Sequence, residues 1–277
     1  SCWFFYFCWQ LQAVLGRAVG FQYDFPYPYE QSLGAYIGLG LSALWISRQH
    51  LSQILSSVLG QTVLTSFNSS TVVNSNREPL PYQLSVFVAL ASFIFLAFFC
   101  SQLGLSFWVF LIFFPCYYAL CLGITRMRAE LGSPVHDQHY YGADQMVYAA
   151  FGTRRLGAHN LTALSFLYFF NRTYDCLLMP HQLEGFKLAD RAKGYNRRFL
   201  VAMLVATIFG TLVAFWAILD STYRHSGAAM SWAGRESFSR LALWLSHPEP
   251  MNITGMVFFI YGLLFGIFIM FMRTKFL

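Results

Sequence analysis

Long apolar stretches separated by short polar segments dominate the chain, and their apolar residues run on continuously instead of alternating with polar ones. A helix needs about 20 mostly apolar residues to cross a bilayer. Four stretches, at residues 82–100, 106–124, 199–219 and 254–272, meet this requirement. Because continuous runs favour helices over the alternating strands of a barrel, we predict an all-α polytopic bundle of transmembrane helices.

Two shorter apolar stretches extend this prediction to about six spanning helices. Residues 32–47 end near Trp45 and Arg48, residue types that are common where a helix leaves the membrane. Residues 2–15 lack the basic start and the cleavage site of a signal peptide, so we expect them to end another span. We expect the chain to be a processed product or the ordered part of a longer protein. A weaker stretch at 161–170 is too short to cross untilted. We expect it to be a re-entrant segment, an interfacial helix or half of a broken helix.

Composition agrees with a single membrane domain over residues 1–277. Hydrophobic residues make up 57% of the chain and charged residues only 11%, whereas soluble proteins carry about 25% charged residues. The net charge of +6 does not indicate nucleic acid as a partner, because the basic residues lie between apolar stretches. Ten of the 18 Lys and Arg residues fall in the region 125–198. Since basic loops stay on the cytoplasmic side, we predict that this region is cytoplasmic and contacts membrane lipid.

Polar side chains beside the predicted spans are candidates for a substrate or ion path. Arg126 and Glu130 stand four residues apart on one helix face, a spacing that suits an ion pair. Such a pair can be a structural clasp, or it can line the mouth of a path, because ionisable groups near membrane depth often mark one. Asn171, Arg172 and Asp175 follow the weak stretch, and polar residues at the ends of broken helices build sites in many transporters.

A second group of side chains could bind a metal ion or carry protons. Two of its members are one helical turn apart, but the H-D-x-H spacing of the other three is not that of a standard zinc site. Each also has an ordinary use as a hydrogen-bonded loop residue. The group consists of His136, Asp137, His139, His181 and Glu184.

Familiar catalytic motifs are absent from the sequence. It contains no Walker loop, GxGxxG, HExxH or GxSxG. All histidines lie outside the predicted spans, where they could not hold a haem within the membrane. We therefore expect no cofactor, and an enzyme is the less favoured class.

Basic residues of the central region are expected to contact lipid headgroups. Residues 180–193 begin with a proline and place apolar and charged residues on opposite faces of a helix, which predicts an amphipathic interfacial helix. Its basic end suits an anionic membrane surface, and two Arg-Arg pairs would hold the flanking segments there. The expected headgroup contacts are Arg154, Arg155, Lys187, Arg191, Lys193, Arg197 and Arg198.

Small residues at helical spacing mark faces where two helices can pack closely. Gly34 and Gly38 form one GxxxG pattern, and Gly262 and Gly266 form another. Such faces let backbones approach each other in lipid, where hydrophobic attraction between helices is absent. We favour packing within the chain over contact with another subunit.

Four segments, at residues 30–51, 124–137, 152–162 and 179–192, resemble in order and spacing a family of large bacterial inner-membrane proteins known only as domains of unknown function. The resemblance covers about residues 30–277. It implies a polytopic protein of the bacterial inner membrane, and the family's general architecture has invited comparison with oligopeptide-transporter-like carriers. It implies no established activity and no catalytic residue.

Three functions are consistent with these observations. A transporter-like protein that moves a small solute is favoured, and it should have a polar site bounded by helix ends. The alternative is a non-catalytic structural or accessory subunit of a larger membrane complex, which should have a long apolar face for other proteins. A membrane enzyme acting on lipid is third, and it should bring the five His, Asp and Glu residues together.

Overall fold

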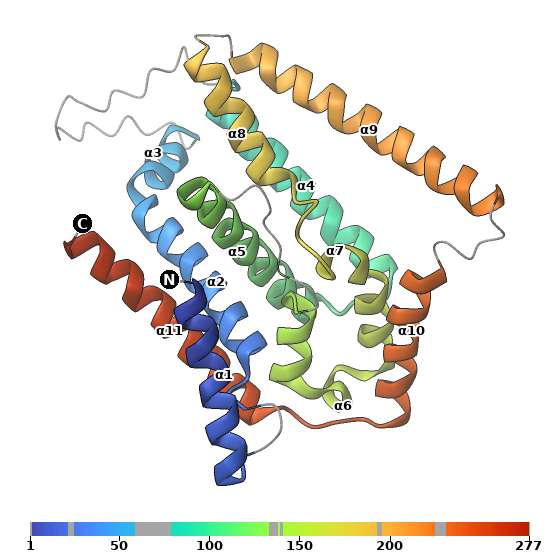
Figure 1. Cartoon of the computed structure of the whole chain (residues 1–277). Coiled ribbons are helices and arrows are strands. Elements are labelled where there is room, and N and C mark those ends of the chain that lie inside the picture. The colour runs from blue at the N-terminus through green and yellow to red at the C-terminus, as the bar shows by residue number, and fades with distance from the viewer. Residues whose placement is uncertain are drawn as a thin grey trace.

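The computed structural model describes residues 2–21, 25–58, 79–132, 138, 141–192, 196–224 and 231–276. Every regular element within these ranges is a helix, so the all-α prediction is confirmed for the described chain (Figure 1). The helices are α1 (Cys2–Val19), α2 (Pro28–Ile46), α3 (Arg48–Val58), α4 (Tyr82–Gln102), α5 (Phe107–Leu131), α6 (Ala143–Phe166), α7 (Tyr168–Asn171), α8 (Leu178–Arg191), α9 (Asn196–Arg224), α10 (Ser231–Ser246) and α11 (Ile253–Phe276).

Four of the described helices are long and apolar enough to cross a membrane. They are α4, α5, α9 and α11, and each corresponds to one of the four long stretches predicted from the sequence, with α5 beginning one residue later than predicted. The shorter predicted spans fall in α1 and α2, which are not among the four. Helix α2 carries polar residues such as Glu30 and Gln31 and several glycines, which lower its hydropathy. The count of six spans therefore stays a prediction.

Helix α2 lies against α11 through the two glycine pairs that the sequence singled out. A Cβ atom at Gly34 would collide with the carbonyl oxygen of Phe259, and one at Gly262 would collide with that of Gln31. Farther along the two helices, a Cβ atom at Gly38 would lie 2.7 Å from the carbonyl oxygen of Leu263. The residue numbers rise together on both sides of this contact, so α2 and α11 run parallel (Figure 1).

A second glycine contact joins α2 to α5. A Cβ atom at Gly40 would collide with the carbonyl oxygen of Ala119, and one at Gly123 would collide with that of Tyr36. Helix α2 is therefore held between α5 and α11 with backbone against backbone on two sides, an approach that only glycine allows. Arg273 near the end of α11 pairs with Glu130 near the end of α5, so the C-terminal ends of all three helices lie at one end of the molecule (Figure 1).

Two of the candidate spans lie at the edge of the molecule. None of the residues in the apolar part of α9 is buried, and very few of those in α4 are. Helix α9 packs mainly on the amphipathic helix α8 and runs away from the α2–α5–α11 group (Figure 1). Helix α5, by contrast, contributes a large share of the buried core, including Phe110, Phe113 and Phe114, and α6 contributes a similar share.

Candidate functional site

Helix α6 is interrupted in its middle by two glycines. Gly152 has φ 71° and ψ 151°, and Gly157 has φ 73° and ψ 165°, a backbone conformation that is essentially restricted to glycine. The segment that leads into α11 supplies hydrogen bonds at the first interruption. The N–H of Asn252 donates to the carbonyl of Ala149 at 2.9 Å, and the N–H of Arg154 donates to the carbonyl of Glu249 at 3.2 Å. Two backbone hydrogen bonds therefore join the first interruption to the segment that leads into α11.

The chain on either side of this interruption runs toward the start of α5 and then back along it. Phe151 packs on Trp108 with ring centroids 5.1 Å apart, and Asn160 Oδ1 accepts a hydrogen bond from the N–H of Ser106 at 2.7 Å. Later residues return along α5, since Phe170 packs on Tyr117 at 5.0 Å. We call residues 141–177 the folded-back segment. The weak apolar stretch at 161–170 lies in its returning half, and the choice among a re-entrant segment, an interfacial helix and half of a broken helix stays a prediction.

A buried ion pair joins α10 to the start of the folded-back segment. Arg240 Nη2 lies 3.1 Å from Asp144 Oδ2, and the side chain of Asp144 is only 1% exposed. The Arg240 guanidinium also lies 4.1 Å from the ring centroid of Tyr168 and 4.7 Å from that of Trp244. Cation–π contacts of this kind are strong when the cation is desolvated, so aromatic faces replace much of the water that Arg240 would otherwise bind.

A second ion pair lies one turn earlier on α10. Glu236 accepts hydrogen bonds from Arg172 Nε at 2.9 Å and from the Tyr168 hydroxyl at 2.8 Å. Arg172 also lies 4.5 Å from the ring of Trp232. Because Tyr168 contacts both Glu236 and Arg240, the two ion pairs form one network between α10 and both halves of the folded-back segment.

Several polar atoms of this network have no hydrogen-bond partner among the described residues. They are Asp144 Oδ1, the Tyr148 hydroxyl and Arg240 Nε, and all are buried. Burial raises the pKa of Asp144 above 3.8 and outweighs the attraction of Arg240, which lowers it. Buried polar groups in proteins are normally paired with protein, water or ligand. The network thus contains an acceptor, a hydroxyl and a donor that have no partner among the described residues.

The predicted path residues fall into two separate places. Arg126 and Glu130 form an ion pair at 3.0 Å near the end of α5, and Glu130 also binds Arg273. Asn171 is buried beside the Asp144–Arg240 network, and Arg172 belongs to it. The Asp175 carboxylate instead binds the Thr173 hydroxyl and the N–H of Cys176, so it caps a turn.

The predicted metal or proton group is only partly described. His136, Asp137 and His139 lie outside the described residues. Glu184 on α8 accepts hydrogen bonds from Arg128 at 2.7 and 3.0 Å, and His181 is exposed on the same helix. Within the described part of the chain, no three His, Cys, Asp or Glu residues are grouped so as to hold a metal ion.

The cations expected to contact lipid do not form one surface. Arg154 and Arg155 are exposed beside the interruption of α6, level with the start of α5. Lys187 and Arg191 line a cavity of about 850 Å³ between α8 and the end of α5, at the opposite end of that helix. Arg197 and Arg198 are exposed on the first turns of α9, and Lys193 lies outside the described residues.

Sequence reasoning missed the central members of the network, which are Asp144, Arg240 and Glu236. A signal was available in α10, because Glu236, Arg240 and Trp244 recur at intervals of four residues and share one helix face. Asp144 carried no comparable signal, since it lies in a short polar stretch between apolar residues.

Comparison with known proteins yields a family and no activity. A family model described as a family of unknown function (DUF6785) matches residues 1–277. Among curated proteins and solved structures, none matches the chain. The family match extends the resemblance from about residues 30–277 to the whole chain. The bacterial source and the likeness to oligopeptide carriers stay predictions.

Proposed function

Because this chain belongs to a family of unknown function (DUF6785), we propose its function from its own geometry: an integral membrane protein that transports a small polar solute. The folded-back segment and α10 form the solute site in this proposal. The observation that carries it is the buried Asp144–Arg240 pair, which joins α10 to the interrupted helix α6 and includes polar atoms without a partner among the described residues.

Physical arguments support a path at this position. Non-helical backbone at membrane depth is tolerated where it is buried in protein or lines a cavity, and interrupted helices form the binding sites of many transporters. Ionisable side chains in such surroundings are costly to bury, so they usually serve a pathway. In this proposal Asp144 Oδ1 accepts a hydrogen bond from the solute, while Arg240 Nε and the Tyr148 hydroxyl donate to it.

The proposal includes a membrane orientation. Arg48, Arg128, Arg273 and Lys275 gather where α2, α5 and α11 end, and basic residues favour the cytoplasmic side. We therefore propose that this end is cytoplasmic. We also propose that α1 and α2 cross the membrane, as a fifth and a sixth span beside the four candidate spans. The bacterial inner membrane is the proposed location.

Transport is tested with purified protein in sealed proteoliposomes. The vesicles are incubated with a defined mixture of amino acids and short peptides, and uptake of each compound is measured by mass spectrometry. We expect at least one compound to accumulate, and Asp144→Asn to reduce its uptake by about tenfold or more, because one partner of a buried charge pair is lost. Asp220→Asn, which breaks an exposed pair with Arg224 on α9, is the matched control and should leave uptake unchanged.

A role as a non-catalytic subunit is the second candidate. It is favoured by the outer helices, since the apolar part of α9 has no buried residue and could pack on another protein. Purification from the native membrane in mild detergent distinguishes the two. A stoichiometric partner that protects α9 from surface labelling, together with no uptake of any compound, would support the subunit and contradict the carrier.

A further inference from the structure

The two parallel helices α2 and α11 separate beyond their glycine contact and leave a cavity between them. The last glycine of α2 that contacts α11 is Gly38, and larger side chains follow on both helices. The resulting cavity has a volume of about 500 Å³, within the range of about 300–1,000 Å³ that is usual for ligand pockets. We call it the α2–α11 wedge, and it is lined by Leu41, Ser42, Trp45, Ile46, Ile267, Met270, Phe271 and Thr274.

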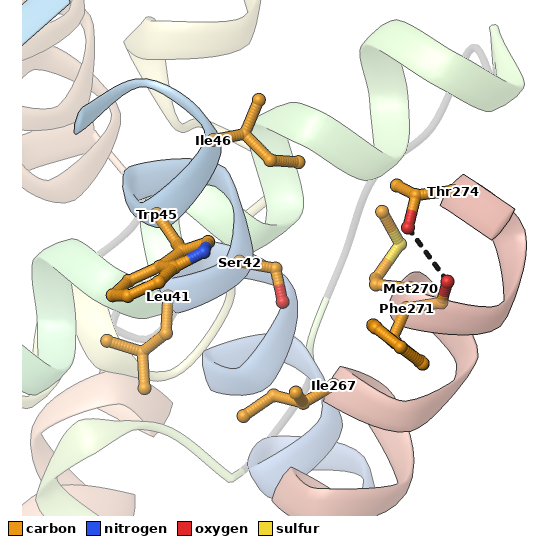
Figure 2. A pocket seen from close by; sticks show the side chains of 8 residues that line it. All are labelled: Leu41, Ser42, Trp45, Ile46, Ile267, Met270, Phe271 and Thr274. Atoms are coloured by element: carbon orange, nitrogen blue, oxygen red, sulfur yellow. Dashed lines mark hydrogen bonds between the residues drawn. The ribbon is translucent and has the colours of Figure 1, made fainter. Parts of the chain in front are cut away.

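The wedge presents a mostly apolar surface. Its two hydroxyls are satisfied within their own helices, because Ser42 donates to the carbonyl of Gly38 at 2.7 Å and Thr274 donates to that of Phe271 at 2.8 Å. Figure 2 shows the side chains of Ser42 and Ile267 turned toward the space between the helices. A hydrocarbon chain fits these walls better than a polar solute, because the walls are mostly apolar and both hydroxyls are already bonded within their own helices.

Cations lie at the mouth of this apolar space. The Arg48 guanidinium lies 4.6 Å from the ring of Trp45, and the Lys275 ammonium lies 5.2 Å from the ring of Phe271. Both rings line the wedge. Arg273 is nearby but pairs with Glu130, so Arg48 and Lys275 supply the excess positive charge at the opening.

We propose that the α2–α11 wedge is a binding site for one anionic phospholipid. One acyl chain lies between Ser42 and Ile267, and the phosphate lies at the mouth against Arg48 and Lys275. Apolar walls and a cationic rim match the two parts of such a lipid, and a Trp residue at the boundary is typical of the membrane interface. This site is separate from the Asp144–Arg240 network, and the proposal does not depend on transport.

Lipid retention tests the proposal. The full chain is reconstituted in vesicles of equimolar phosphatidylglycerol and phosphatidylcholine, extracted in a nonionic detergent, and the lipid that stays bound is counted by native mass spectrometry. We expect about one retained lipid per chain with a clear preference for phosphatidylglycerol. Retention in the same ratio as in the vesicles would mean ordinary surrounding lipid only and would overturn the proposal.

Two kinds of variant separate the apolar wall from the rim. Ser42→Leu and Thr274→Leu fill the wedge from opposite sides, and each should abolish retention of both lipids. Arg48→Gln and Lys275→Gln should each reduce the preference for phosphatidylglycerol by about fivefold, while Arg197→Gln, which removes an exposed cation elsewhere, should not. Unchanged retention in both filling variants, or the same loss of preference in Arg197→Gln, would contradict the site. A dimer of the wild-type chain that dissociates in Ser42→Leu, with no retained lipid, would also overturn it in favour of a second copy as the occupant.

Discussion

The two acidic residues of the polar network, Asp144 and Glu236, have pKa values that are shifted in opposite directions. Asp144 is fully buried, and burial raises its pKa in spite of Arg240. For Glu236, burial also acts to raise the pKa, but the hydrogen bonds from Arg172 and Tyr168 outweigh it, and the pKa is lowered below 4.5. Burial of Asp144 thus opposes its ionisation in spite of the pair with Arg240, whereas the partners of Glu236 favour its ionisation in spite of burial.

The Glu236 pair should stabilise the fold above the ordinary pKa of a glutamate. Because the pKa of Glu236 is lower in the folded protein than its usual 4.5, its contribution is present at neutral pH and is lost as the pH falls through the folded pKa. We expect Glu236→Gln to lower the thermal unfolding midpoint in detergent by about 2–4 °C at pH 7. The difference from the wild type should shrink below pH 4.5.

Glu249→Gln is the control for this measurement, since the Glu249 side chain is exposed in the segment before α11 and is not a member of the network. It should leave the midpoint unchanged at both pH values. A difference between Glu236→Gln and the wild type that grows in acid would contradict the assigned role of the ion pair.

Among the elements, α6 departs most from what its sequence suggests. The two glycines that interrupt it, Gly152 and Gly157, have nearly equal positive φ angles, but their surroundings differ. A Cβ atom at Gly152 would lie 2.6 Å from the carbonyl carbon of Pro250, whereas nothing lies within 4 Å of one at Gly157. The segment that leads into α11 therefore packs against the first interruption, whereas the space where a Cβ atom would lie at the second is open.

This difference predicts unequal effects of alanine at the two positions. Gly157→Ala should cost about 1–3 kcal/mol from backbone strain, and Gly152→Ala should cost that amount and more, because the segment at Pro250 must also move. Thermal unfolding in detergent checks the order. Equal midpoints for the two variants would show that the contact with Pro250 does not hold the break.

Gly210→Ala on the exposed face of α9, where nothing lies within 4 Å of the added Cβ, is the reference for the scale. Gly costs about 1 kcal/mol relative to Ala inside a helix, so this change should leave the midpoint the same or raise it.

At the scale of the whole molecule, the parallel arrangement of α2, α5 and α11 determines which parts of the chain lie on the same side of the membrane. Their C-terminal ends meet at the Glu130–Arg273 pair, and α4 enters α5 by a short turn at their opposite end. Single cysteines in a background without native cysteines can report this arrangement through labelling of intact cells with a reagent that does not cross membranes.

We expect Gln49→Cys and Lys275→Cys to behave alike and to be protected in intact cells. Gln102→Cys and Glu249→Cys should be labelled, because they lie at the other end of the candidate spans. Opposite behaviour of Gln49→Cys and Lys275→Cys would contradict the parallel arrangement of α2 and α11. Labelling of these two with protection of the other pair would keep the fold and reverse the proposed orientation.

The helical class and the four long apolar helices follow from the sequence by itself, because bilayer thickness and backbone hydrogen bonding leave few alternatives for such stretches. The glycine pairs of α2 and α11 were also visible in it, since small residues at helical spacing are a local pattern. Tertiary structure alone decided that α6 folds back, because Gly152 could break, cap or pack a helix until the segment near Pro250 was placed against it. It also decided that Asp144 and Arg240, 96 residues apart, form a buried pair, since a contact between distant residues depends on the path of the whole chain.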